Sequence, residues 1–100
     1  MKDLEILNSI YYAELYCQKN NVKSNYEACK KTNSLLMIIK IGDFNLFIEH
    51  FIDGNEIVFN LYKNKSQVYA DSVRNIADGL NEVERHIAEF EGRYYSAAGA

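Results

Sequence analysis

The sequence predicts an α+β domain in which a helix at each end of the chain packs against an antiparallel sheet. Three observations support this prediction. Apolar residues recur at helical spacing near both ends, the segments between them are rich in β-branched and aromatic residues, and turn-forming residues separate those segments. The chain has no proline and no glycine- or serine-rich stretch. We therefore expect one domain over residues 1–95 and a flexible tail over 96–100.

The first predicted element is a helix over residues 3–19, ended by Asn20-Asn21. Its apolar residues lie on one face at helical spacing, with a second group beside them. The face comprises Leu4, Leu7, Tyr11 and Leu15, and the residues beside it are Ile6, Ile10, Ala13 and Cys17. Ser24 and Glu27 then have the spacing of a capping box, which predicts a short second helix over 25–31.

The middle of the chain predicts a three-stranded antiparallel meander. Its strands cover residues 34–41, 44–52 and 56–62. Gly42-Asp43 and Asp53-Gly54-Asn55 separate them, and these residue types tolerate the positive φ of hairpin turns.

The turn at Gly42-Asp43 also predicts the register, because a two-residue turn places Ile41 opposite Phe44. One face of the meander is then almost entirely apolar and forms the core. It comprises Met37, Ile39, Ile41, Phe44, Leu46, Ile48, Ile57, Phe59 and Leu61. The opposite face is more than half apolar, which is unusual for a face that meets only water.

An apolar row near the C-terminus predicts one long amphipathic helix that starts between Ser66 and Ser72 and runs to Tyr95. The row comprises Tyr69, Val73, Ile76, Leu80, Val83, Ile87, Phe90 and Tyr94. An alternative interpretation places a short strand at 67–70 before the helix.

At about 1.5 Å per residue this helix is about 45 Å long, whereas an eight-residue strand spans about 27 Å. The helix should therefore extend beyond the sheet. Val83, Ile87, Phe90 and Tyr94 would then need cover from the first helix or from a second molecule. The two alternatives predict a monomer and a complex, such as a homodimer.

Charge is segregated along the chain, which carries a net charge of −3. Five lysines fall between residues 19 and 40, whereas all the charged residues between 43 and 56 are acidic. Such a layout lacks the dominant basic surface of a nucleic-acid-binding protein, so we expect no direct nucleic-acid binding. There is also no apolar run of about 18 residues, so we expect no membrane span and a cytoplasmic protein.

A search for catalytic or ligand-binding motifs finds none: there is no glycine-rich phosphate loop, no GxSxG and no HExxH. His50 falls on the predicted core face, where a hydrogen-bonded core histidine is expected. Cys17 and Cys29 are expected to be small buried residues. No metal, no cofactor and no enzymatic activity are predicted.

Acidic residues of the last helix are the predicted partner-binding residues. Asp78, Glu82 and Glu89 form a ridge away from the apolar row, which Glu84 and Glu91 supplement, and such a ridge could imitate a phosphate backbone in a basic groove. The order of helix, meander and helix is similar to that of the double-stranded-RNA-binding domain. Where that family has a lysine cluster, however, the chain carries acids, so we do not expect that function.

The whole chain, a short and acidic single domain rich in Asn and Tyr, resembles the small phage-encoded inhibitors that include anti-CRISPR proteins. The resemblance implies stoichiometric binding to a host nuclease complex, often at its nucleic-acid groove, without catalysis. We therefore expect a non-enzymatic protein-binding module that inhibits a host nucleic-acid-handling complex in a bacterial cytoplasm. The alternative is a homodimeric acidic chaperone or adaptor.

Overall fold

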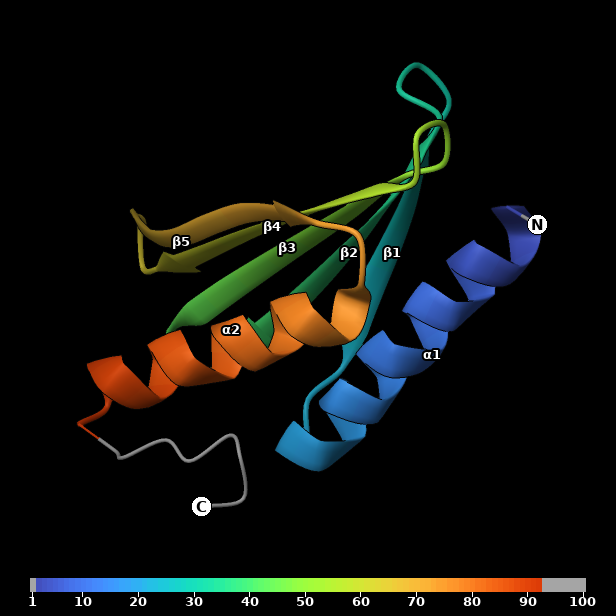
Figure 1. Ribbon diagram of the computed structural model, residues 1–100. Helices are drawn as coiled ribbons and strands as arrows, with labels where there is room; N and C mark the ends of the chain where they lie inside the picture. Colours follow the sequence, from blue (N-terminus) through green and yellow to red (C-terminus); the bar gives the residue numbers. More distant parts are fainter. Residues whose placement is uncertain (1, 93–100) are drawn as a thin grey trace.

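The computed structural model describes residues 2–92 and shows two helices and one sheet (Figure 1). In chain order the elements are α1 (Lys2–Asn20), β1 (Ser24–Cys29), β2 (Ser34–Ile41), β3 (Phe44–Phe51), β4 (Glu56–Lys63), β5 (Ser66–Val73) and α2 (Ile76–Phe90).

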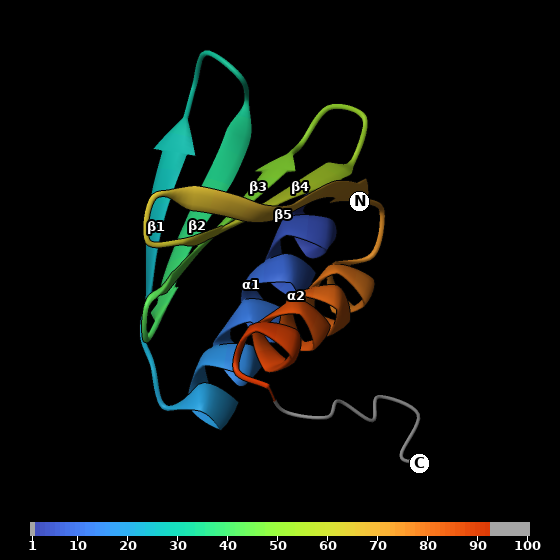
Figure 2. The ribbon, with the colours of Figure 1, turned by 90° about the vertical axis from the view of Figure 1, so that its left-hand side faces the viewer.

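The sheet is an antiparallel meander of five strands in the order β1-β2-β3-β4-β5. Both helices lie on the same face of this sheet and leave the other face uncovered (Figures 1 and 2). The α+β class and the terminal helices agree with the sequence prediction, but the predicted number of three strands is wrong.

The segment predicted as a short second helix is the edge strand β1, in which Tyr26 pairs with Met37 of β2. The capping-box spacing of Ser24 and Glu27 therefore does not start a helix here. The six residues of β1 pair along their whole length with the apolar strand β2, and those tertiary contacts outweigh a local signal worth about 1 kcal/mol.

The fifth strand, β5, replaces the first part of the predicted long helix. Tyr69 and Val73 are four residues apart, which places them on one side of a helix but also on one side of a strand. A turn at Asn64-Lys65, where Asn64 takes a φ of 56°, folds β5 back onto β4. The alternative of a short strand at 67–70 was thus nearer to the structure.

The predicted register of the hairpin formed by β2 and β3 is confirmed, since Ile41 pairs with Phe44 and Met37 pairs with Ile48. The core lies between this sheet face and the two helices. Its fully buried sheet residues include Met37, Ile39, Leu46, Ile48, Phe59 and Leu61.

Helix α2 starts at Ile76 and is 15 residues long, so it spans about 22 Å instead of the predicted length of about 45 Å, and the predicted end at Tyr95 lies outside the described residues. Asn75 caps it by accepting a hydrogen bond from the Ala77 N–H at 2.8 Å. Gly79 faces the ring of Phe59 so closely that a Cβ atom there would lie 2.2 Å from the ring. A glycine at this point lets the helix axis approach the sheet.

Candidate protein-binding surfaces

Helix α1 is apolar on two opposite faces. The inner face packs on the sheet with Ala13, Tyr16 and Cys17 buried. The residues predicted to form the main apolar face point the other way and are exposed. Their exposed fractions are 63% for Leu4, 60% for Leu7, 60% for Tyr11 and 42% for Leu15. We call these four residues, together with Tyr12 at 37%, the outer row of α1.

The outer row contains most of the exposed large hydrophobic residues of the described chain. Of seven such residues, five belong to the row and the others are Tyr26 and Phe90. Single exposed apolar residues are ordinary on a protein surface, but a contiguous set marks an interaction site more often than not. The outer row is therefore the first candidate surface.

A shallow groove of about 190 Å³ adjoins this row between the two helices. It is lined by Tyr12, Leu15, Tyr16, Lys19, Ala77, Leu80 and Asn81. The groove widens the apolar surface toward α2 and places one positive charge, that of Lys19, at its border. A helix laid along the outer row would also contact this groove.

The uncovered face of the sheet is the second candidate surface. Its apolar residues are only partly exposed, because neighbouring strands shield one another, and they are Leu36, Ile38, Phe47, Phe51, Val58 and Tyr62. The face that was predicted to be more than half apolar thus meets neither α1 nor α2 (Figures 1 and 2). Neither helix of the described residues combines the length and the apolar content that a membrane crossing needs.

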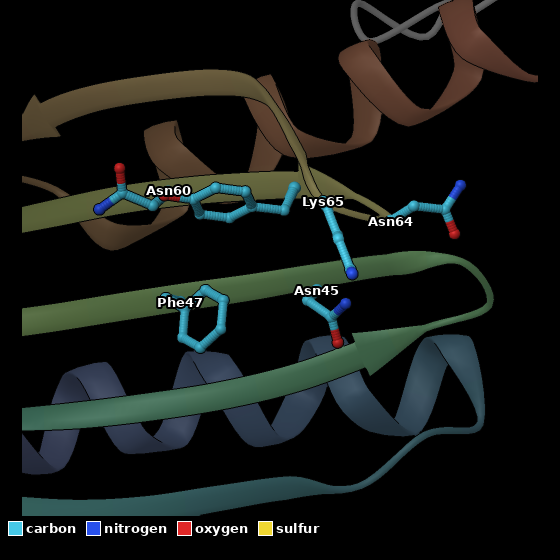
Figure 3. Close-up of a pocket in the computed structure, with 6 residues that line it drawn as sticks. Asn45, Phe47, Asn60, Asn64 and Lys65 are labelled. Carbon is cyan, nitrogen blue, oxygen red and sulfur yellow. The ribbon is translucent and has the colours of Figure 1, made fainter.

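An open hollow of about 570 Å³ lies on this face, at the end where β4 turns into β5 (Figure 3). The rings of Phe47 and Tyr62 pack edge to face, with 5.9 Å between their centroids. Lys65 extends from the turn toward β3 (Figure 3). The remaining lining residues are Asn45, Asn60 and Asn64. The hollow can offer ring contacts, amide hydrogen bonds and one positive charge, but its shallow shape selects no ligand class.

The acidic residues predicted on the last helix divide into two groups. At 100° per residue, Asp78, Glu82 and Glu89 lie on the side of α2 opposite its buried residues, whereas Glu84 and Glu91 lie to one flank. Arg85 sits within the first group and bonds Glu82 at 2.8 Å and Glu89 at 2.7 Å. The predicted ridge therefore exists as an ordered line of charges, but one arginine partly neutralises it.

Two of the four residues predicted as a partner seam lie inside the fold. Val83 is fully buried and Ile87 is 3% exposed, so α1 and the sheet of the same chain cover them. Phe90 is 50% exposed and its ring lies edge-on to Phe44 at 6.0 Å. Tyr94 lies outside the described residues. Val83 and Ile87 thus have no surface to offer a second molecule.

His50 forms a buried hydrogen-bond network that joins α1, β3 and the β3–β4 turn. The Ser9 hydroxyl lies 2.7 Å from Nδ1 of His50, and Oδ1 of Asn55 lies 2.9 Å from Nε2. Because the Asn55 oxygen can only accept, Nε2 donates to it, and in the neutral imidazole Nδ1 then accepts from the Ser9 hydroxyl. This confirms the prediction of a hydrogen-bonded core histidine.

The same network brings a serine and a histidine into the contact that hydrolases use to activate a nucleophile. Ser9, however, is 1% exposed and lies in the middle of α1, and His50 is 2% exposed. The two residues line a small pocket of about 120 Å³, but almost none of their surface is open to it, because each forms its hydrogen bonds within the fold. The network therefore fixes α1 on the sheet. Sequence reasoning found His50 but neither Ser9 nor Asn55, since nothing in the sequence signals contacts at those separations.

The two cysteines differ in environment. Cys17 is buried as predicted, and burial raises the pKa of its thiol. Cys29 is exposed on the edge strand, contrary to prediction, and a hydrogen bond from the Thr32 side chain lowers the pKa of its thiol. Among the described residues no cluster of three His, Cys, Asp or Glu side chains could hold a metal ion.

No protein-family model, no curated protein and no solved structure matches this chain.

Proposed function

We propose that the protein is a non-enzymatic protein-binding module that acts by direct contact with other protein chains, as an adaptor does. The observation that carries this proposal is the outer row of α1. Its five large apolar side chains contribute little to the core, because they point away from the sheet. Fully burying an exposed large apolar side chain contributes roughly 1.5–3 kcal/mol, and these side chains are 37–63% exposed, so a partner that covers the row gains a part of that free energy from each of them.

The arrangement of polar groups supports the same proposal. The Ser9 hydroxyl and the His50 imidazole form hydrogen bonds inside the fold, where they position α1. The exposed surfaces instead carry apolar side chains and ordered charges, which are the elements of protein–protein contacts.

The proposal is tested by following the tagged chain in a cell lysate by size-exclusion chromatography. We expect the wild-type chain to elute in complexes larger than 11.6 kDa. Leu7→Glu, which places a charge in the outer row, should reduce the fraction in complexes at least fivefold. Ala70→Glu makes a similar change on exposed β5 and is the matched control. Equal elution of wild type and Leu7→Glu would contradict the proposal.

A second candidate function, the inhibitor implied by the sequence resemblance, rests on the acidic side of α2. The specific observation in its favour is that Arg85 holds Glu82 and Glu89 side by side on the outward surface, facing solvent. A basic groove of a nucleic-acid-handling complex would find these carboxylates already ordered.

The inhibitor function is tested by adding the protein in equimolar amounts to a CRISPR-type nuclease complex and measuring DNA cleavage. We expect inhibition that the double variant Glu82→Lys/Glu89→Lys abolishes. Asp71→Lys, which changes the charge of an exposed residue on β5, should retain it. Inhibition that is unchanged in the double variant would exclude the acidic side of α2 as the contact.

A further inference from the structure

We infer that the outer row of α1 binds a second copy of this chain, with the two α1 helices packed antiparallel. This inference rests on the proposed function, which identifies the row as a protein-binding surface without assigning its occupant. It differs from the sequence-based expectation of a dimer through the end of the last helix, because Val83 and Ile87 are buried within one chain.

The spacing of the outer row suits a pair of helices. Leu4, Leu7, Tyr11 and Leu15 follow one another at intervals of three, four and four, which keeps them on one line along the helix. The line is about 16 Å long, at 1.5 Å per residue. It is long enough for helix–helix packing and has no charged residue within it.

An antiparallel pair makes this line self-complementary. With a two-fold axis at Tyr11, the two Tyr11 side chains meet each other and Leu7 of each chain meets Leu15 of the other. Leu4 then lies against Gln18 at each end. Tyrosine at the centre of an interface, with aliphatic residues around it, is the usual arrangement of an energetic hot spot.

Charge selects the antiparallel direction. Glu5 lies near the start of α1, and Lys19 lies in its last turn. Antiparallel packing brings Lys19 of one chain to within one turn of Glu5 of the other, whereas parallel packing would place each charge at the level of its own counterpart and form no such pair. The helix dipoles favour the same direction. Glu14 is held toward β1, where it accepts hydrogen bonds from Ser24 and Tyr26.

The outer row is large enough for an interface of the smaller class. The exposed parts of its five side chains amount to roughly 500 Å² per chain, so a dimer that covered all of them would bury about 1,000 Å², the threshold of a specific interface, and the adjoining groove would add to this area. The outward side of α2 is a poorer surface for a dimer than the outer row of α1. There, Asp78, Glu82 and Glu89 would face the same negative charges of the second copy. A foreign partner would need an apolar row of its own, which a second copy already has.

The association is tested with the purified chain by light scattering coupled to size exclusion, from 1 to 100 µM. We expect a mass of twice 11.6 kDa at the upper concentrations. Leu7→Glu should raise the dissociation constant at least about 100-fold, because each dimer carries the charge twice in apolar contacts. Its circular dichroism should remain that of wild type, since Leu7 is 60% exposed. A wild-type chain that is monomeric at 100 µM would overturn the inference.

The direction is tested by cross-linking with a short bismaleimide in a Cys29→Ser background, which removes the exposed native thiol. Tyr11→Cys should cross-link efficiently, because both residues 11 lie at the two-fold axis. Leu4→Cys is the matched control, since the two residues 4 would be about 21 Å apart along the axis. Efficient cross-linking at both positions would indicate parallel helices and overturn the antiparallel pairing.

The two proposals fail in different ways. A purified monomer whose lysate complexes still depend on Leu7 would overturn the second copy as occupant and leave the protein-binding function intact. A purified monomer with no complexes that depend on Leu7 would overturn both.

Discussion

The two helices cover the same face of the sheet, yet they use their surfaces differently. Helix α2 buries one apolar side, including Val83 and Ile87, and presents charged residues such as Glu82 and Glu89 to solvent. Helix α1 buries an apolar side as well, but its opposite side is also apolar. The difference shows that α2 has the composition that folding alone requires, whereas α1 carries apolar residues that folding does not use.

The two helices also contact the sheet in different ways. Gly79 allows α2 to lie directly on Phe59, so a methyl group added at this position would collide with the ring. Helix α1 is instead fixed by the hydrogen bond between Ser9 and His50 and by its buried small residues, Ala13 and Cys17. Both helices are thus held firmly, and the outer row of α1 is presented on a rigid support.

The largest predicted effect is on the free energy of unfolding, and it distinguishes equivalent truncations in the two helices. Ile87→Ala should lower the free energy of unfolding by about 2–5 kcal/mol, because it leaves a cavity in the core. Leu7→Ala should change it by less than about 0.5 kcal/mol in the monomer, because Leu7 is exposed. Urea denaturation at submicromolar protein measures both. A loss of several kcal/mol in Leu7→Ala would show that the outer row belongs to the core.

An intermediate effect is predicted for Gly79→Ala. Alanine normally stabilises a helix relative to glycine by about 1 kcal/mol, but here the added Cβ collides with Phe59. We expect a net destabilisation of about 1–3 kcal/mol, which is typical of overpacking, measured by thermal and urea unfolding. Asn81→Ala, at an exposed position of the same helix, is the control and should be neutral or stabilising. A stabilised Gly79→Ala variant would mean that α2 lies farther from the sheet.

The smallest predicted effect concerns the contact between α1 and the edge strand. A hydrogen bond from Tyr26, and a second from Ser24, hold the pKa of Glu14 below its ordinary value of 4.5. Because the folded-state pKa is the lower one, the contribution to stability is complete above pH 4.5 and is lost as the pH falls through the folded-state pKa.

Glu14→Gln should therefore reduce stability slightly at neutral pH and flatten its decline in acid, which urea midpoints between pH 3 and 7 would record. Glu27→Gln, at an exposed acid of β1, is the control. A wild-type pH profile in Glu14→Gln would show that the cluster does not hold in solution.

The central hairpin was predictable from the sequence, whereas the two edge strands were not. Alternating apolar residues and the Gly42 turn specify one register for β2 and β3, because a shift by one residue would expose the core face. The segment of β1 was wrongly predicted as a helix, because the local spacing of Ser24 and Glu27 suits a helix cap. Only its pairing with β2 makes this segment a strand. The segment of β5 was assigned to the long last helix, with a short strand at 67–70 only as the alternative. The assignment was wrong because an apolar spacing of four suits both a helix and a strand.

The candidate surface could be predicted only in part. The sequence identified Leu4, Leu7, Tyr11 and Leu15 as one face of a helix, but it could not show which way that face points. In a helix that is apolar on several sides, the direction depends on contacts with distant residues, such as that of Ser9 with His50. Of the acidic residues predicted to bind a partner, Asp78, Glu82, Glu84 and Glu89 fall within α2 and Glu91 is its C-cap. The pairing of Glu82 and Glu89 with Arg85 emerged only from the three-dimensional arrangement.

The meander has a consequence for how the chain acquires its structure. Each strand pairs with the next strand along the sequence, so most sheet contacts close short loops and the contact order is low for a β-rich protein. Synthesis from the N-terminus would deliver α1 and the strands in the order in which they pair, and α2 would complete the core last. Until α2 arrives, Phe59 lacks its contact with Gly79. We therefore expect folding in milliseconds for the finished chain and aggregation of chains truncated before residue 76.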